Sequence, residues 1–131
     1  MIALDTNVLV RFVVDDDDAQ CAKAHRLIAR AIGRGESIFI SDVTLCEFVW
    51  VLRSAYRFPR RQIADTLGQL LDASHLEFQG QPGLAAALSA YRAGKGDFAD
   101  YVIRSRARGA GCESVATFDR ALHAEDAFVT P

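Results

Sequence analysis

The residues best suited to chemistry in this chain are acids that stand at the ends of apolar segments. Asp5 follows the first apolar run, and Asp119 follows a late one. Glu47 lies alone among apolar residues, and Asp97 and Asp100 are three positions apart. Carboxylates that share a pocket raise one another's pKa unless a cation lies among them. Such a set of oxygen donors favours binding of a hard divalent metal ion.

The elements that must position these acids alternate between short apolar runs and helical patterns. The predicted strands cover residues 1–5, 37–40, 76–79, 114–117 and 127–129. The predicted helices cover residues 7–14, 19–32, 42–56, 60–72, 82–94 and 98–107. Strands separated by helices pair in parallel, which predicts an α/β protein, a three-layer α/β/α sandwich with a central, mostly parallel sheet. Ligands bind at the carboxyl ends of such strands, so we expect the acids to converge on one pocket.

Length and composition favour a single globular domain over residues 1–131. Half of the residues are apolar and 24% are charged, which is ordinary for a globular protein. No apolar run approaches the ~18 residues of a membrane span, and the N-terminus lacks the basic segment of a signal peptide. The three cysteines, Cys21, Cys46 and Cys112, are widely spaced. They are expected to be reduced core thiols of a cytoplasmic protein.

The charge balance argues against a protein that coats nucleic acid by general attraction. The net charge is −2 and the pI is about 5.9. Thirteen of the fifteen basic residues are Arg, whose planar guanidinium suits bidentate contact with phosphate. Arg104 and Arg108 share one stripe of the helix that starts beside Asp97, which makes them candidates to hold a phosphate. The alternative is that they pair with Glu113 or with a protein partner.

Glu47 has a structural interpretation beside the functional one. Together with Thr44 it matches a capping box, in which Glu accepts the amide of the capping residue. Ser41 and Asp42 are better capping residues, however, and they would place Glu47 beyond the first turn, facing the core. A buried carboxylate there would need a metal, an Arg or a proton.

The other acids also have structural alternatives. Asp5 could form an Asx-turn, Asp97 could be the N-cap of its helix, and Asp119 could cap a short helix after it. An N-cap at Asp97 leaves Asp100 without an explanation. Taken together, the alternatives do not explain why each of these elements begins or ends with an acid on the same side of the predicted sheet. The run 15–18 is predicted to be a solvated connection that caps the following helix.

Four segments resemble one protein family, in the right order and over the whole chain. They are LDTNVLVRFVVDDD, TLCEFVWVL, GDFADYVIRSRARGAGC and VATFDRA. The chain resembles a PIN domain, and more closely a ribonuclease toxin of the VapC type from a bacterial toxin–antitoxin pair. The LDTN start and the TFD end are specific in combination.

The resemblance implies a set of site residues. Asp5, Glu47, Asp100 and Asp119 would be the acidic quartet. Asp97 would be an additional acid one turn earlier, and whether Asp97 or Asp100 contacts the metal stays open. The groups that would orient the carboxylates or a bound water are Thr6, Asn7 and Thr117.

The resemblance and the residue types together imply a reaction. Mg²⁺ or Mn²⁺ held by Asp5, Asp100 and Asp119 would polarise a phosphodiester and lower the pKa of a bound water. Glu47 would complete the shell or accept the water's proton. The products would carry a 5′-phosphate and a 3′-hydroxyl. The family also implies an RNA substrate, a cognate antitoxin protein and a homodimer.

Three alternatives come from other classes of protein. A receiver-type phosphoacceptor domain would need paired acids after the first strand and a Lys after a late one, and both are missing. A haloacid-dehalogenase-type phosphatase would need Asp at position 7, which is Asn7. A PIN-like module that binds RNA or a partner without cutting would be expected to lose acids, whereas this chain has all of them.

Overall fold

Short parallel strands alternate with helices in both parts of the chain. The computed structural model describes residues 1–16 and 18–131. The chain divides into two compact units, Met1–Gln79 and Gly80–Pro131, each described by itself. The elements of the first unit are β1 (Ile2–Ala3), α1 (Thr6–Val13), α2 (Ala19–Gly33), β2 (Ile38–Ile40), α3 (Asp42–Ser54), α4 (Arg60–Asp72) and β3 (Leu76–Phe78).

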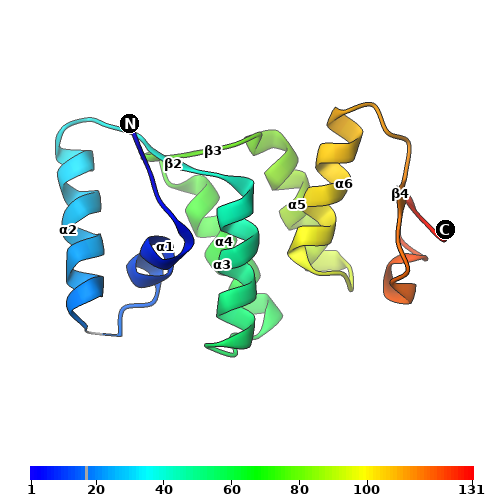
Figure 1. Ribbon diagram of the computed structural model, residues 1–131, viewed down its shortest axis with the longest axis horizontal. Helices are drawn as coiled ribbons and strands as arrows, with labels where there is room; N and C mark the ends of the chain where they lie inside the picture. The colour runs from blue at the N-terminus through cyan, green and yellow to red at the C-terminus, as the bar shows by residue number, and fades with distance from the viewer. Residues whose placement is uncertain (17) are drawn as a thin grey trace. The chain divides into compact units, whose positions relative to one another are not determined.

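The first unit is built on a parallel sheet with strand order β1-β2-β3 (Figure 1). Ala3 pairs with Phe39, and Ile40 pairs with Phe78. This register brings the carboxyl ends of all three strands to one edge, because parallel strands all point the same way. Asp5 and Ser41 each lie shortly after such an end. Both acidic candidates of this unit, Asp5 and Glu47, therefore follow strands that end at the same edge.

Helical spacing of apolar residues builds the core of the first unit. In α2, the residues Cys21, Ala24, Ile28 and Ala31 recur every three or four positions and are buried. Helix α1 packs against α2 and α3. The buried side chains of α1, α3 and α4 are Leu9, Val10, Leu45, Phe48, Val49, Leu52, Ile63, Ala64, Leu67 and Leu70. This packing fixes the start of α1, where Asp5 lies.

The second unit pairs two helices with a smaller parallel sheet. Its elements are α5 (Gln81–Ala93), α6 (Phe98–Gly109), β4 (Val115–Ala116), the 3₁₀ helix η1 (Arg120–Leu122) and β5 (Phe128–Val129). Val115 pairs with Phe128 in the sheet. Helix α5 packs along α6, and the ring of Tyr101 meets that of Phe128 edge-on. Asp119 follows the carboxyl end of β4, as the sequence pattern predicts.

Most predicted elements are found close to their predicted bounds, and two details differ. The predicted strand 1–5 is shorter, because the chain turns into α1 directly after Leu4. Cys21 is buried, but Cys112 is exposed, so the prediction that all three cysteines lie in the core is wrong. The acidic run 15–18 includes Asp17, which lies outside the described residues. Among the described helices, none has the length and hydropathy needed to cross a membrane.

Candidate functional site

Asp5 is held at the edge of the first unit's sheet by its own helix. It is the N-cap of α1, and its Oδ1 accepts the amide of Val8 at 3.1 Å. The side chain is otherwise exposed, which leaves carboxylate oxygen available for a further ligand. Thr6 is the first residue of α1 and Asn7 follows it. The Asx-type cap therefore does not exclude the predicted chemical role of Asp5, because a carboxylate has about four acceptor positions.

Glu47 lies in the second turn of α3 and is exposed to solvent. The N-cap of this helix is Ser41, whose Oγ accepts the amide of Thr44 at 3.1 Å. Glu47 is therefore not part of a capping box, as expected. The expectation that its side chain faces the core is wrong. Exposure removes the desolvation cost of the charge, so Glu47 needs no partner in order to be stable where it is.

The second unit brings several carboxylates near Asp100. Burial is the main cause that raises the pKa of Asp100, and the charges of Asp97, Asp119 and Glu125 raise it further. The amide of Asp97 acts in the opposite direction, because it donates to Asp100 Oδ2 at 2.8 Å. This bond is one half of a capping box at the start of α6. The capping box is thus a structural explanation for Asp100, which the sequence alone did not provide. Asp100 also lies close enough to three other acids for their charges to raise its pKa.

The segment after β4 fixes Asp119. Its amide donates a hydrogen bond to Thr117 Oγ1 at 3.1 Å, and its Oδ1 accepts the amide of Ala121 at 2.9 Å. Asp119 is therefore the cap of η1, which confirms the structural alternative for this residue. The predicted orienting group Thr117 acts on the backbone of Asp119, and the ring of His123 lies 2.7 Å from the Thr117 carbonyl oxygen.

Glu125 is a member of this cluster that no pattern in the sequence predicted. Its Oε1 accepts the hydroxyl of Tyr101 at 2.7 Å, and its Oε2 accepts the amide of Lys95 at 3.1 Å. The same Tyr101 hydroxyl accepts the amide of buried Gly96 at 2.9 Å. This network determines the path of the chain just before Asp97. No spacing in the sequence links Glu125 to Asp97, since the two are joined only by folding of the unit.

Arg104 and Arg108 are both engaged within the second unit. The guanidinium of Arg104 lies over the rings of Tyr101 and Phe128 and donates to the Asp126 carbonyl at 2.9 Å. Arg108 forms an ion pair with the Asp126 carboxylate at 2.6 Å. The ion-pair alternative is thus present, with Asp126 as the acid in place of Glu113. A phosphate would compete with these partners for both side chains.

A second acidic group lies before α2. Ligand atoms of Asp16, Asp18 and Cys21 are within 4.8 Å of one another. Arg11 pairs with both carboxylates, at 3.1 and 3.5 Å, and Asp18 caps α2 through the amides of its first turn. The hydrogen bond to Asp16 is the main cause that raises the pKa of Cys21. The Arg11 guanidinium and the amides at the start of α2 already satisfy these carboxylates, so the group is structural. For its described residues, this agrees with the prediction of a connection that caps the following helix.

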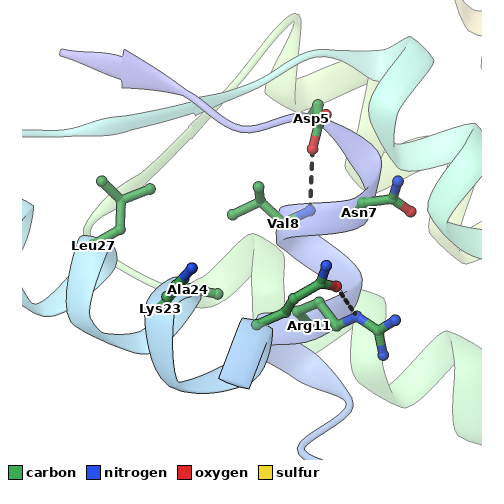
Figure 2. A pocket seen from close by; sticks show the side chains of 8 residues that line it. Asp5, Asn7, Val8, Arg11, Lys23, Ala24 and Leu27 are labelled. Carbon is green, nitrogen blue, oxygen red and sulfur yellow. Dashed lines mark hydrogen bonds between the residues drawn. The ribbon is translucent and has the colours of Figure 1, made fainter. Parts of the chain in front are cut away.

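A cavity of about 310 Å³ opens beside Asp5, between α1 and α2 (Figure 2). Its walls are formed by Asp5, Asn7, Val8, Arg11, Gln20, Lys23, Ala24 and Leu27. The volume is at the lower end of the range for small-molecule sites. The predicted site residues Asp5 and Asn7 therefore border a space that can hold part of a ligand.

Two comparisons with known proteins show the family to which the chain belongs. The family model described as PIN domain matches residues 2–126. The chain is also similar to a VapC ribonuclease from Aquifex aeolicus (strain VF5), with 23% identity over 120 residues. That alignment covers 92% of this chain and 88% of the relative. The predicted resemblance and the α/β fold class are thereby confirmed, and the matches place the chain among the PIN nucleases.

Proposed function

Because the chain belongs to the PIN-domain family, we propose that it is a metal-dependent endoribonuclease and the toxin of a toxin–antitoxin pair. The observation that carries this proposal is the environment of Asp100. Its carboxylate is partly buried in the field of three further acids, and each of these charges raises its pKa. A divalent cation would reverse that penalty, because it favours the charged form of every carboxylate around it.

The residues available in each unit fit such an ion. Asp5 offers carboxylate oxygen in the first unit, and Asp100 and Asp119 offer it in the second. Asp97 is the additional donor, and we place Asp100 ahead of it, since Asp100 is partly buried and burial raises its pKa. Hard oxygen donors of this kind suit Mg²⁺ or Mn²⁺. When bound, either ion would polarise a phosphodiester and lower the pKa of a bound water.

The chain's own residues would accept the proton and orient the reacting groups. Glu47 is exposed and unpaired among the described residues, so it is free to accept a proton from the attacking water. Asn7 and Thr6 would orient groups near Asp5, and Thr117 holds the backbone of Asp119. In-line attack would leave a 5′-phosphate and a 3′-hydroxyl. We propose that all these groups act together within one PIN domain spanning residues 1–131.

The test replaces each of the two capping aspartates by Asn and, in addition, Asp5 by Ala. Asp5→Asn and Asp119→Asn should each abolish cleavage of RNA in Mg²⁺, and both should keep the fold, because Asn caps a helix as well as Asp does. Asp5→Ala should also lose about 1 kcal/mol of stability, since the Val8 amide loses its acceptor. Cleavage of labelled RNA and thermal unfolding by circular dichroism, with and without Mg²⁺, measure the two effects.

Two results would contradict the proposal. One is cleavage by the Asn variants at the wild-type rate. The other is a melting temperature that Mg²⁺ raises no more in wild type than in the variants, which would mean that these acids bind no metal. Persistent RNA binding without cleavage by wild type would instead indicate a silent PIN-like module.

The proposed partners follow from the same assignment. RNA is the proposed substrate, a cognate antitoxin is the proposed inhibitor, and the cytoplasm is the proposed location. The printed name of the relative, VapC ribonuclease, supports RNA as the substrate. A short neighbouring reading frame that encodes a DNA-binding protein, and copurification of its product with this chain, would support the antitoxin.

A further inference from the structure

The cavity beside Asp5 has an uneven distribution of charge. Asp5 lies at the start of α1, while Lys23 projects from α2 on the other side (Figure 2). Lys23 is exposed and has no ion pair with any residue that the structure describes. It is one of only two lysines in the sequence. The cavity thus has a carboxylate at the helix start and, across from it, an ammonium that has no counter-ion among the described residues.

The other cation of the cavity is already neutralised. Arg11 pairs with Asp16 and Asp18, and its Nε donates to Gln20 Oε1 at 3.1 Å. These bonds tie α1 to the start of α2 and fix the width of the space between the two helices. A ligand anion entering the cavity would therefore meet Lys23 as the cation that lacks a described counter-ion.

The remaining walls suit a nucleoside. Val8, Ala24 and Leu27 form an apolar side, and Asn7 and Gln20 contribute amides. A small cavity with apolar walls and a few polar groups is the usual form of a small-molecule site. Its volume, about 310 Å³, limits the occupant to about one nucleotide.

We propose that this cavity holds the nucleotide next to the scissile phosphate, with the phosphate of that nucleotide on Lys23. The inference rests on the proposed ribonuclease function, because Asp5 is the point where the cleaved bond would lie. The RNA strand would then leave the reacting phosphate along the space between α1 and α2. Lys23 is a substrate-binding residue in this scheme. It would act without displacing an ion pair of the described residues, whereas Arg108 would have to leave the Asp126 carboxylate.

The first experiment uses a mononucleotide, so that it does not depend on cleavage. Adenosine 5′-monophosphate is titrated into ¹⁵N-labelled wild type, Lys23→Gln and Arg26→Gln. Arg26 is the matched control, since it is exposed on the same helix, loses the same charge and does not line the cavity. We expect shifts at the amides of Val8, Lys23 and Ala24 in wild type. Affinity should fall about two- to fivefold in Lys23→Gln and stay unchanged in Arg26→Gln, as for one exposed ionic contact.

Two further ligands separate nucleotide binding from simple anion binding. Adenosine should bind more weakly than its monophosphate and equally to wild type and Lys23→Gln. Inorganic phosphate should also bind more weakly, because it cannot use the apolar wall. Equal binding of the monophosphate to wild type and Lys23→Gln would overturn the proposal, as would inorganic phosphate binding as tightly as the nucleotide.

The second experiment uses RNA on an inactive background. In Asp100→Asn, a short random-sequence RNA oligonucleotide is titrated at several salt concentrations, with and without Lys23→Gln. Removal of one phosphate contact to a single strand should reduce the slope of log affinity against log salt by about 0.7. If Lys23→Gln leaves RNA binding unchanged and weakens antitoxin binding, the cavity serves a protein partner and the proposal is wrong. Absence of cleavage by wild type with intact mononucleotide binding would reject the ribonuclease assignment and leave the nucleotide site standing.

Discussion

At the scale of single residues, the candidate acids perform structural work as well as the chemistry proposed for them. Asp5, Asp97 and Asp119 each cap a helix, and Asp100 completes a cap from inside its helix. A capping carboxylate uses one oxygen for a backbone amide and keeps lone pairs for another ligand. The caps therefore hold each side chain in place at no cost to its capacity to bind an ion.

The raised pKa of Asp100 predicts how stability depends on pH. Its pKa is higher in the folded state than the usual 3.8, mainly because of burial, so the native state holds the proton to higher pH than the unfolded chain. This contribution to stability is full at acidic pH and is lost as pH rises through the folded pKa. Asp100→Asn should therefore raise the melting temperature at pH 7, in the absence of metal, and have little effect at about pH 4. Asn also keeps an oxygen for the Asp97 amide.

Glu113→Gln serves as the control for this measurement. Glu113 is an exposed acid in the same unit. Its replacement removes the same charge outside the cluster, so the gain at pH 7 should be absent or much smaller. An equal gain in both variants would mean that general charge repulsion, and not the environment of Asp100, determines the effect.

Glu47 provides a residue-scale prediction that separates chemistry from stability. Glu47→Gln should abolish or strongly reduce cleavage with no measurable change in urea unfolding, because the side chain is exposed and Ser41 makes the cap. Initial rates of RNA cleavage and the unfolding midpoint are measured on the same preparation. Cleavage at the wild-type rate would remove Glu47 from the site.

At the scale of elements, the start of α3 is the point where the sheet edge meets the helix that carries Glu47. Ser41→Ala removes the acceptor of the Thr44 amide and should cost about 1 kcal/mol of unfolding free energy. Ser41→Asp should restore most of that loss, since Asp caps equally well. Urea denaturation measures both. A loss that Asp fails to restore would show that packing of the Ser41 side chain, and not capping, stabilises this end.

The sequence predicted these elements because most of their signals are local. Apolar spacing defined α2 to within one residue at its end, and Pro59 placed the start of α4 correctly. The exposure of Glu47 could not be predicted, because it depends on which face of α3 the neighbouring elements cover. Glu125 was missed for a related reason. Its contacts with Tyr101 and Lys95 join positions 24 and 30 residues apart, and only tertiary folding creates them.

At the scale of the whole molecule, the proposed homodimer has a convenient reporter. Trp50 is the only Trp in the sequence, and it is 60% exposed on α3. Exposed Val43 lies seven residues earlier, on the same face of the helix. Exposed apolar groups that cluster on one face are typical of protein interfaces. Sedimentation at micromolar concentration should give twice the 14.3 kDa mass of the chain, and Trp emission should shift to longer wavelength on dilution. A single-chain mass at every concentration would contradict the dimer.

The capping role of Asp5 and Asp119 has a consequence for genetics. If the active protein stops the growth of its host, cells that survive its expression will carry inactivating mutations. A change of one base converts an Asp codon into an Asn codon, and Asn still satisfies the amides of Val8 and Ala121. Survivors with these changes should therefore accumulate intact, soluble protein, whereas survivors with core mutations should lose it. Sequencing the plasmids from well-expressing colonies would identify the acids that are needed for toxicity and not for folding.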